Sequence, residues 1–128
     1  MEIVEKTMST QKIPHNGEVW WVNLPNQPND PHQPRTAIIV STNGRNRMAA
    51  DVIVVPTTSY REKHHQEYHI FLPAEEGGLP NDSLAKCEQI TTLDKSLLGS
   101  GPLGAPIKFG YRERIINAIK IAIGDTLV

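Results

Sequence analysis

Four side chains of this sequence are of types that suit a phosphate group. Arg35 carries a planar fork of N–H donors that fits phosphate oxygens two at a time. Thr57, Thr58 and Ser59 carry hydroxyls that can donate hydrogen bonds to the same oxygens. The alternatives are a surface arginine and hydroxyls that only satisfy backbone groups where a strand ends. The residue types therefore allow an anion site without requiring one.

Two opposite charges, Lys86 and Glu88, alternate with other residues in the segment 83–90. If this segment is a strand, its period of two places both charges on one face and Cys87 with Gln89 on the other. An acid or base beside a phosphate-binding cation would explain the pair. A surface ion pair worth less than ~1 kcal/mol would explain it equally simply.

The histidines and the cysteine do not form a recognisable metal or nucleophile pattern. His64, His65 and His69 include an i, i+4 pair, but no Glu accompanies them as in metalloproteases, and residues 68–72 look like a strand. Cys87 is the single cysteine, which excludes an internal disulfide framework and a multi-thiolate metal site, and we expect a packed core thiol. Glycine-rich phosphate loops and nucleophile elbows are absent from the sequence. We expect no metal and no cofactor.

Five short apolar segments must position these candidates. They are rich in β-branched or aromatic residues, are separated by Gly, Pro and Asn, and comprise residues 18–24, 36–41, 51–58, 68–72 and 83–90. This spacing predicts a small, strongly bent antiparallel sheet or barrel rather than alternating βαβ units. In such a sheet Arg35 begins the second strand, and Thr58 and Ser59 end the third.

Two helices are expected in the C-terminal half. Apolar residues recur at helical spacing over 111–123, and Gly124 follows where a left-handed C-cap would lie. A shorter helix is predicted over 92–98, with Thr92 as its N-cap and Asp94 in its first turn. Residues 99–104 then read as a loop.

Length and composition indicate one globular domain. The chain has 128 residues, of which 38% are hydrophobic and 21% charged. We expect a flexible N-terminal extension over residues 1–14 and a single domain over 15–128. No apolar run approaches the ~20 residues that span a bilayer, and residues 1–12 lack the apolar centre of a secretory signal. The expected location is the cytoplasm.

Charge is segregated along the chain although the net charge is only −1. Residues 31–65 carry five Lys or Arg against two Asp or Glu, whereas residues 66–107 carry two against six. A basic segment that contacts phosphates is therefore allowed, and salt-dependent binding would be its signature. The alternative is a solvated surface with no partner.

The segment 25–34 contains proline at every third position. Polyproline II has three residues per turn, so the rings would line one edge of an extended segment. This segment is either a recognition element for a proline-binding partner or a surface connection that proline stiffens.

Four segments taken together resemble the MazF/PemK toxins of bacterial toxin–antitoxin systems. They are residues 17–24, 35–41, 52–59 and 82–95, and the most specific part is the string Cys-Glu-Gln-Ile-Thr-Thr-Leu-Asp-Lys at 87–95. The resemblance implies a mainly β fold with short helices, namely an SH3-like barrel of the CcdB/MazF type with a C-terminal helix, assembled as a homodimer. It also implies a metal-independent, sequence-specific endoribonuclease (an mRNA interferase) that acts on single-stranded RNA. A cognate antitoxin would wrap the dimer and block its groove.

The resemblance also assigns roles by position. Arg35 matches the catalytic arginine of the family and Thr58 its catalytic threonine. Glu88 and Lys86 match acidic and basic positions used for catalysis and RNA contact, and Ser59 and Gln89 match positions near the RNA.

This sequence departs from the family at two places. The family's RNA-binding segment before the arginine is replaced by the proline-rich segment, in which only His32 and Gln33 are candidate RNA-binding replacements. The family's Arg-Pro is also Arg35-Thr36 here.

A metal-free cleavage mechanism fits these residues as a hypothesis. Arg35 would stabilise the charged phosphorane, and protonation of the leaving oxygen is a second role open to it. Thr58 would donate a hydrogen bond to a non-bridging oxygen, and Glu88 would act as general base with Lys86 or His32 as helper. The products would carry 2′,3′-cyclic phosphate and 5′-hydroxyl ends. One of the adjacent tryptophans at 20 and 21 could stack a base, while at least one packs in the core.

Two other functions remain open. CcdB-type toxins have the same barrel, bind DNA gyrase and cleave nothing, and an inactive family member would serve as an RNA- or protein-binding module.

Overall fold

The computed structural model describes residues 13–25, 34–61 and 66–124. The expected flexible extension over 1–14 therefore lies almost wholly outside the described residues. The candidates His32 and Gln33, most of the proline-rich segment, and His64 and His65 lie outside them as well. Within the described part, none of the helices has the length and apolar character needed to cross a membrane.

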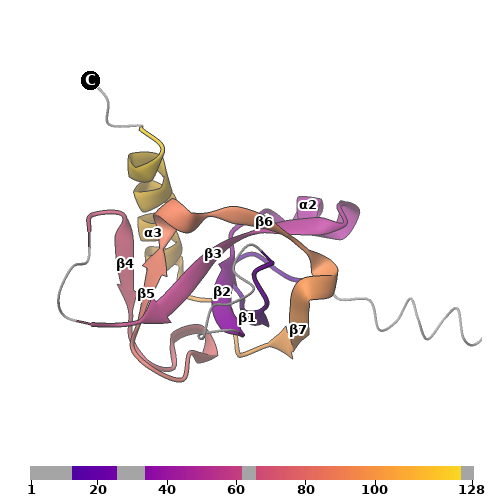
Figure 1. Cartoon of the computed structure of the whole chain (residues 1–128), viewed down its shortest axis with the longest axis horizontal. Helices are drawn as coiled ribbons and strands as arrows, with labels where there is room; N and C mark the ends of the chain where they lie inside the picture. The colour runs from indigo at the N-terminus through magenta and orange to yellow at the C-terminus, as the bar shows by residue number, and fades with distance from the viewer. Residues whose placement is uncertain (1–12, 26–33, 62–65, 125–128) are drawn as a thin grey trace, which may run out of the picture.

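One bent antiparallel sheet dominates the described residues (Figure 1). Its strands are β1 (Val19–Val22), β2 (Arg35–Ile39), β3 (Asp51–Ser59), β4 (His69–Leu72), β5 (Ser83–Lys86), β6 (Thr91–Asp94) and β7 (Leu98–Pro102). The strand order is β4-β5-β3-β2-β1-β7, and β6 pairs with β3 beside β5. The predicted mainly β fold is confirmed, although in the described part the sheet does not close into a full barrel.

Strand β3 is the centre of the sheet because it pairs with three neighbours. Its middle residues pair with β2, its first residues pair with β6, and its last three residues pair with β5. The chain turns from β5 into β6 through the short 3-10 helix η2 (Cys87–Gln89). The end of β3 is therefore held on both sides, by β2 and by β5.

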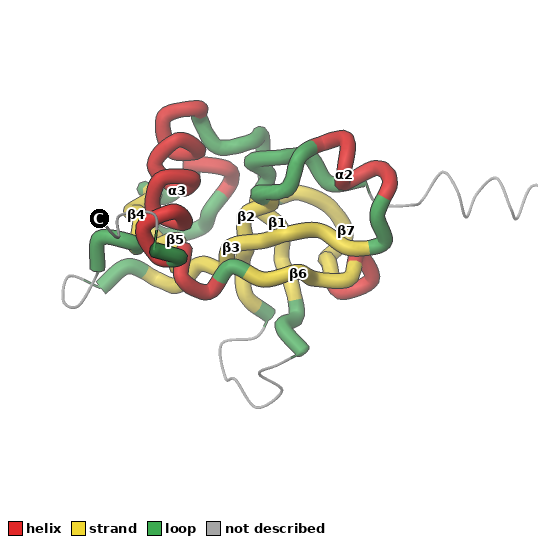
Figure 2. The backbone as a smooth tube through the Cα atoms, turned by 90° about the horizontal axis from the view of Figure 1, so that it is seen from above, coloured by secondary structure: helices red, strands yellow, loops and turns green. Residues whose placement is uncertain are grey.

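The C-terminal helix α3 (Phe109–Ala122) confirms the prediction over 111–123, and Gly124 follows it with a φ of 100°, the left-handed conformation expected there. Figure 2 shows α3 over the end of the sheet that carries β4 and β5. A second helix, α2 (Asn43–Met48), was not predicted because it has only six residues. The remaining 3-10 turns are η1 (Glu76–Gly78) and η3 (Lys95–Leu97).

The predicted helix over 92–98 is wrong. This segment forms most of β6, then η3, and then the first residue of β7. The Asp94 carboxylate does accept a hydrogen bond from a backbone N–H, that of Ser96 at 2.9 Å, but the bond closes a single short turn. Leu93 is buried opposite Val52 in the sheet, and this pairing overrides the local helix signal. The loop predicted over 99–104 is β7 as far as Pro102.

The predicted fifth strand is too long. Strand β5 ends at Lys86, and Cys87 already belongs to η2. The period of two therefore stops before Glu88, so the prediction that Lys86 and Glu88 share a strand face is wrong. The physical reason is the corner: the chain must leave β5 and reverse to reach the other half of β3.

Apolar side chains form two cores, one on each face of the central strands. The core under α3 contains Val19, Ile38, Val55, Leu72, Ile107 and Ile115, and the opposite core contains Trp20, Val22, Ala37, Ile39, Val54 and Leu93. Alternate residues of β1 and β2 thus enter opposite cores. Trp20 is 3% exposed and Trp21 is 43% exposed, which confirms that the two rings point to opposite faces.

Candidate functional site

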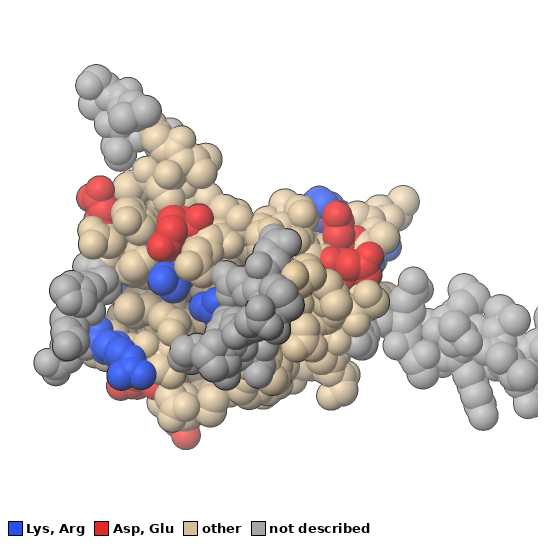
Figure 3. Space-filling view, in the orientation of Figure 1, with Lys and Arg blue, Asp and Glu red and all other residues tan. Residues whose placement is uncertain are grey.

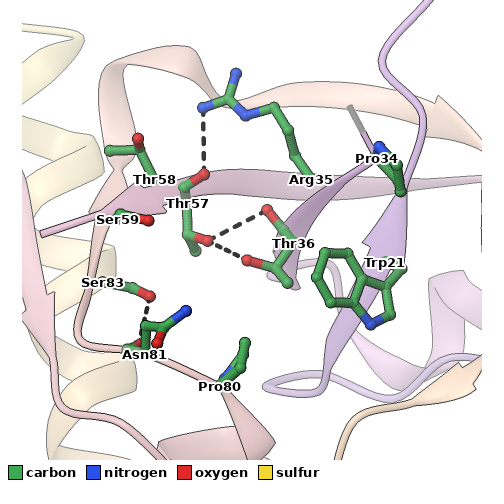
Figure 4. Close-up of a pocket in the computed structure, with 10 residues that line it drawn as sticks. All are labelled: Trp21, Pro34, Arg35, Thr36, Thr57, Thr58, Ser59, Pro80, Asn81 and Ser83. Carbon is green, nitrogen blue, oxygen red and sulfur yellow. Dashed lines mark hydrogen bonds between the residues drawn. The ribbon is translucent and has the colours of Figure 1, made fainter. Parts of the chain in front are cut away.

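A pocket lies where β2 begins and β3 ends (Figure 4). Its lining comes from four places in the chain: Trp21 on β1, residues 34–36 at the start of β2, residues 57–59 at the end of β3, and Pro80, Asn81 and Ser83 before and at the start of β5. The lining therefore includes three of the predicted site residues, Arg35, Thr58 and Ser59. Segments far apart in the sequence meet here because β3 pairs with both β2 and β5.

Arg35 is positioned by the end of β3. Its Nη2 donates a hydrogen bond to the backbone carbonyl of Thr57 at 3.2 Å, and its side chain is half-buried. Figure 4 shows the Arg35 guanidinium and the Thr58 hydroxyl on the same side of the strands. The hydrogen bond holds the guanidinium plane beside the terminus of β3, which is the pre-organisation that charge stabilisation requires.

The strand register explains this neighbourhood. Ala37 of β2 lies opposite Pro56 of β3, and the same register continued by two residues sets Arg35 opposite Thr58. A buried hydrogen bond between the hydroxyls of Thr36 and Thr57 joins the two strands one position further in. Neighbouring threonines thus have different surroundings. The Thr57 hydroxyl is buried between the two strands, whereas Thr58 is half-exposed at the pocket.

Sequence reasoning did not single out Asn81 and Ser83 as site residues. Ser83 lies opposite Ser59 in the β3–β5 pairing, and its Oγ donates to the Asn81 carbonyl at 2.8 Å. The available signal was the polar run 81–83 directly before a strand, which is where loops present functional groups. These residues add polar side chains to the wall facing Arg35.

Glu88 lies outside the lining of this pocket. Its Oε2 is 3.0 Å from Nε2 of His69, whose side chain is only 8% exposed. The backbone N–H of Gln66 donates to Nδ1 of the same ring at 3.1 Å, so the neutral ring carries its proton on Nε2 and donates it to Glu88. The sequence allowed a surface ion pair between Lys86 and Glu88. Among the described residues, the Glu88 carboxylate instead pairs with His69.

Lys86 and Gln89 flank Glu88 but occupy different surroundings. Lys86 is half-buried at the end of β5, opposite His69 on β4. Gln89 lines a second pocket with Leu24, Pro25, Pro56 and residues 91–93. Its Oε1 is buried and has no hydrogen-bond partner among the described residues. The predicted site residues are therefore divided between the pocket at the strand ends and the corner at η2.

Cys87 is the buried member of the η2 corner. Burial, and secondarily the neighbouring Glu88 carboxylate, raises the pKa of the Cys87 thiol from 9.0 to about 12. The thiol therefore stays protonated at neutral pH and is a poor nucleophile. This confirms the expected packed core thiol.

The described residues contain no cluster of three or more His, Cys, Asp or Glu side chains that could hold a metal ion. The described member of the histidine group, His69, is engaged with Glu88 and Gln66 instead.

Basic side chains gather near the site. Figure 3 shows Lys and Arg over β3 and β5, on the face where the strands end, with acidic side chains close by. Arg35 begins β2, Lys86 ends β5 and the exposed Arg61 follows β3. This local positive charge suits a polyanion even though the chain as a whole is nearly neutral.

The chain was compared with curated proteins, with solved structures and with protein families. No curated protein matches the chain significantly. An endoribonuclease structure from a mycobacterial species is 26% identical, with a TM-score of 0.70 over 89% of this chain and 94% of that one. A mycobacterial endoribonuclease in complex with its cognate antitoxin is 27% identical, with a TM-score of 0.70 over 87% and 95%.

More distant structures share the fold. MazF from Deinococcus radiodurans is 20% identical, with a TM-score of 0.70 over 88% of this chain and 98% of that chain. The family described as PemK-like, MazF-like toxin of type II toxin–antitoxin system matches residues 15–123. Because that match covers nearly all of the described sheet and helices, the chain belongs to the PemK-like, MazF-like toxin family of type II toxin–antitoxin systems.

Proposed function

We propose that this protein is an endoribonuclease toxin that cleaves single-stranded mRNA at specific sequences without a metal ion and is inhibited by a cognate antitoxin. The observation that carries the proposal is the presence of Arg35 and Thr58 in the lining of one pocket. Membership of the toxin family and the likeness to mycobacterial endoribonucleases support it.

The proposed reaction uses a nucleophile that RNA itself supplies. The ribose 2′-hydroxyl attacks the adjacent phosphorus, the bond to the 5′-oxygen breaks, and the products carry 2′,3′-cyclic phosphate and 5′-hydroxyl ends. DNA lacks this hydroxyl and is not a substrate. The attack needs no metal-activated water, so the protein must supply charge stabilisation and proton transfer.

Arg35 and Thr58 are assigned to the phosphate. The guanidinium would stabilise the negative charge that grows on the phosphorane oxygens, and the Thr58 hydroxyl would donate to a non-bridging oxygen. Arg35 is a poor general acid because a guanidinium holds its proton very tightly. Its hydrogen bond to the Thr57 carbonyl supports this electrostatic role by orienting the group before substrate arrives.

Proton abstraction from the 2′-hydroxyl is assigned to Glu88, with Lys86 or His32 as helper. Glu88 is exposed to solvent at η2, which contacts β3, and His69 restrains one of its oxygens. A single RNA strand that runs along β3 could then contact both Thr58 and Glu88. The leaving 5′-oxygen would take its proton from the helper, Lys86 or His32.

Further RNA contacts are assigned to Ser59, Lys86 and Gln89, together with His32 and Gln33. Ser59 lines the same pocket as Arg35, and Gln89 lines the second pocket. The exposed Trp21 ring beside Arg35 is available to stack on a base at ~1–3 kcal/mol.

We also propose a homodimer that acts in the cytoplasm, where mRNA is found. An apolar surface supports the dimer: Ile116 is exposed on α3 beside a pocket lined by Ile38, Ile39 and Ile107. The structure of a related endoribonuclease with its cognate antitoxin supports the antitoxin partner. Sedimentation equilibrium of the purified protein tests the dimer, and a monomer at all concentrations would contradict it.

The deciding experiment incubates the purified protein with a long natural RNA in the presence of EDTA. Primer extension then maps the cuts, and end analysis identifies the products. Recurrent cuts at one short sequence with cyclic phosphate ends support the proposal. Intact RNA together with trapped DNA gyrase would instead support a gyrase poison. Intact RNA that binds without cleavage would support an inactive binding module.

A further inference from the structure

Phe71 is an aromatic side chain that the sheet leaves exposed. It lies on β4, the edge strand, and 41% of its surface is accessible. Its neighbours on the strand, Ile70 and Leu72, point the other way into the core under α3. Because α3 covers that opposite side, the face that carries Phe71 remains outside the helix packing.

The register of the sheet aligns Phe71 with the proposed phosphate site. Phe71 lies opposite Leu84 of β5, and Leu84 lies opposite Thr58 of β3. Residues directly opposite in antiparallel strands share a face, so Phe71 and Thr58 share one, separated by two strand spacings or ~10 Å. Continuing the row by one strand reaches Arg35.

The Phe71 ring is braced, that is, held in place by a neighbouring aromatic ring. The Tyr60 ring packs edge-on against it, with ring centroids 5.0 Å apart and planes at 76°. Tyr60 directly follows β3, and its backbone N–H donates to the Asp82 carbonyl at 2.9 Å, which fixes the strand end. Leu84, which is buried, lies between Phe71 and Thr58 in the row. A ring held in this way loses little conformational entropy when another flat ring stacks on it.

Cations border this aromatic surface. Lys86 lies two residues from Leu84 on β5 and therefore on the same face, and Arg61 is exposed directly after Tyr60. Figure 3 shows basic side chains over β3 and β5 on this side of the molecule. Aromatic rings interleaved with Lys and Arg are the combination that binds single-stranded nucleic acid, because the rings stack bases while the cations contact phosphates.

We propose that Phe71, braced by Tyr60, is a stacking platform for an unpaired nucleobase that neighbours the cleaved phosphodiester. The ligand is a base of the same single-stranded RNA whose phosphate lies at Arg35 and Thr58, so this inference rests on the proposed function. It adds a binding subsite that lies outside the pocket at the strand ends. Stacking is tolerant of base identity, so Phe71 contributes affinity while other residues select the sequence.

The test compares Phe71→Ala and Phe71→Trp with the wild-type protein on a short RNA that carries the mapped cleavage sequence. Phe71→Ala raises the KM about tenfold and leaves kcat nearly unchanged, because stacking acts equally in the ground and transition states. Phe71→Trp restores the wild-type KM because a larger ring also stacks. Phe109→Ala is the matched control, since Phe109 is 66% exposed at the start of α3 and its loss leaves KM unchanged.

A second measurement identifies the stacked base. The RNA is made uncleavable by a 2′-deoxy sugar at the cut, and each flanking base is removed in turn to leave an abasic site. One abasic position weakens binding of the wild-type protein about tenfold and has no further effect on Phe71→Ala. Equal losses in both proteins at every position would overturn the platform.

The outcomes separate this inference from the proposed function. If the wild-type protein neither cuts nor binds RNA, the proposed function fails and the platform with it. If the wild-type protein cuts and Phe71→Ala has an unchanged KM, only the platform fails, and the exposed ring is left to a protein partner such as the antitoxin. Thermal unfolding of each variant shows whether a change in KM reflects lost folding instead. If Phe71→Ala does not fold, Phe71→Leu, which keeps an apolar side chain without an aromatic ring, takes its place in both measurements.

Discussion

The pocket at the strand ends and the corner at η2 hold the two halves of the predicted site in different ways. In the pocket, Arg35 and Thr58 belong to regular paired strands and meet through their register. At the corner, Glu88 belongs to a 3-10 turn, and His69 on another strand holds its carboxylate. The first region is built by backbone pairing and the second by a side-chain contact.

The difference matters for chemistry because the two regions need different rigidity. A group that stabilises transition-state charge must be oriented before the substrate arrives, and a paired strand end provides that. A proton acceptor must instead reach the substrate in its bound position, and a partly exposed carboxylate in a turn has that freedom. The division of labour predicts unequal effects when each region is altered.

Arg35→Ala is expected to have the largest effect. The cleavage rate should fall by at least ~10²-fold, since a charge-stabilising donor is lost at the phosphate. Single-turnover cleavage of the mapped RNA measures it, with Arg47→Ala as a control because Arg47 is exposed on α2. Full activity of Arg35→Ala would show that the pocket takes no part in cleavage and would leave the corner at η2 as the region that matters.

Glu88→Gln tests the corner. Loss of the base should lower the rate about 10²-fold and abolish the acidic limb of the pH–rate profile, because the amide cannot take a proton. Gln keeps an oxygen that can accept from His69 Nε2, so the local fold is preserved. An unaltered rate and pH profile would exclude Glu88 as base and confine the catalytic groups to the strand ends.

Two adjacent threonines separate a role in cleavage from a role in stability within the pocket. Thr58→Val should slow cleavage about tenfold by removing one hydrogen bond to a charged oxygen, with little change in stability. Thr57→Val should leave the cleavage rate of the folded protein nearly unchanged. It should instead lower the free energy of unfolding by about 1–3 kcal/mol, because it breaks the buried hydrogen bond to Thr36. Cleavage rates and urea unfolding measured on both variants check the contrast, and equal behaviour of the two would refute it.

The effect expected at Cys87 is absent at neutral pH and appears only in alkaline solution. The unfolded chain releases the thiol proton above pH 9.0, whereas the folded protein keeps it to about pH 12. The contribution of this thiol to folding stability is therefore fully present below pH 9.0 and is lost as the pH rises toward 12, by up to ~1.4 kcal/mol per pH unit.

Urea unfolding of the wild-type protein and Cys87→Ala at a series of alkaline pH values measures this slope. The variant starts from a lower stability because it loses buried volume, but its slope should be shallower. Identical slopes would show that the thiol does not titrate differently in the two states.

The sequence predicted the parts of the site that belong to regular strands. Alternation and punctuation placed Arg35 at the start of β2 and Thr58 with Ser59 at the end of β3, and the structure agrees. The same reasoning failed at residues 87–98, where it extended a strand through η2 and predicted a helix instead of β6. Local hydrophobic spacing cannot report which half of β3 a segment will pair with.

What the sequence alone determined is the list of side chains, the strand periodicity that alternates them between two cores, and the family resemblance carried by its motifs. Only the tertiary structure decided which of these side chains meet. Pairing of β3 with β2 and β5 brought Arg35, Thr58 and Ser83 to one pocket. The corner at η2 turned Glu88 toward His69. The reason is that strand pairing and chain reversal depend on contacts between distant residues, whose free energy no local pattern contains.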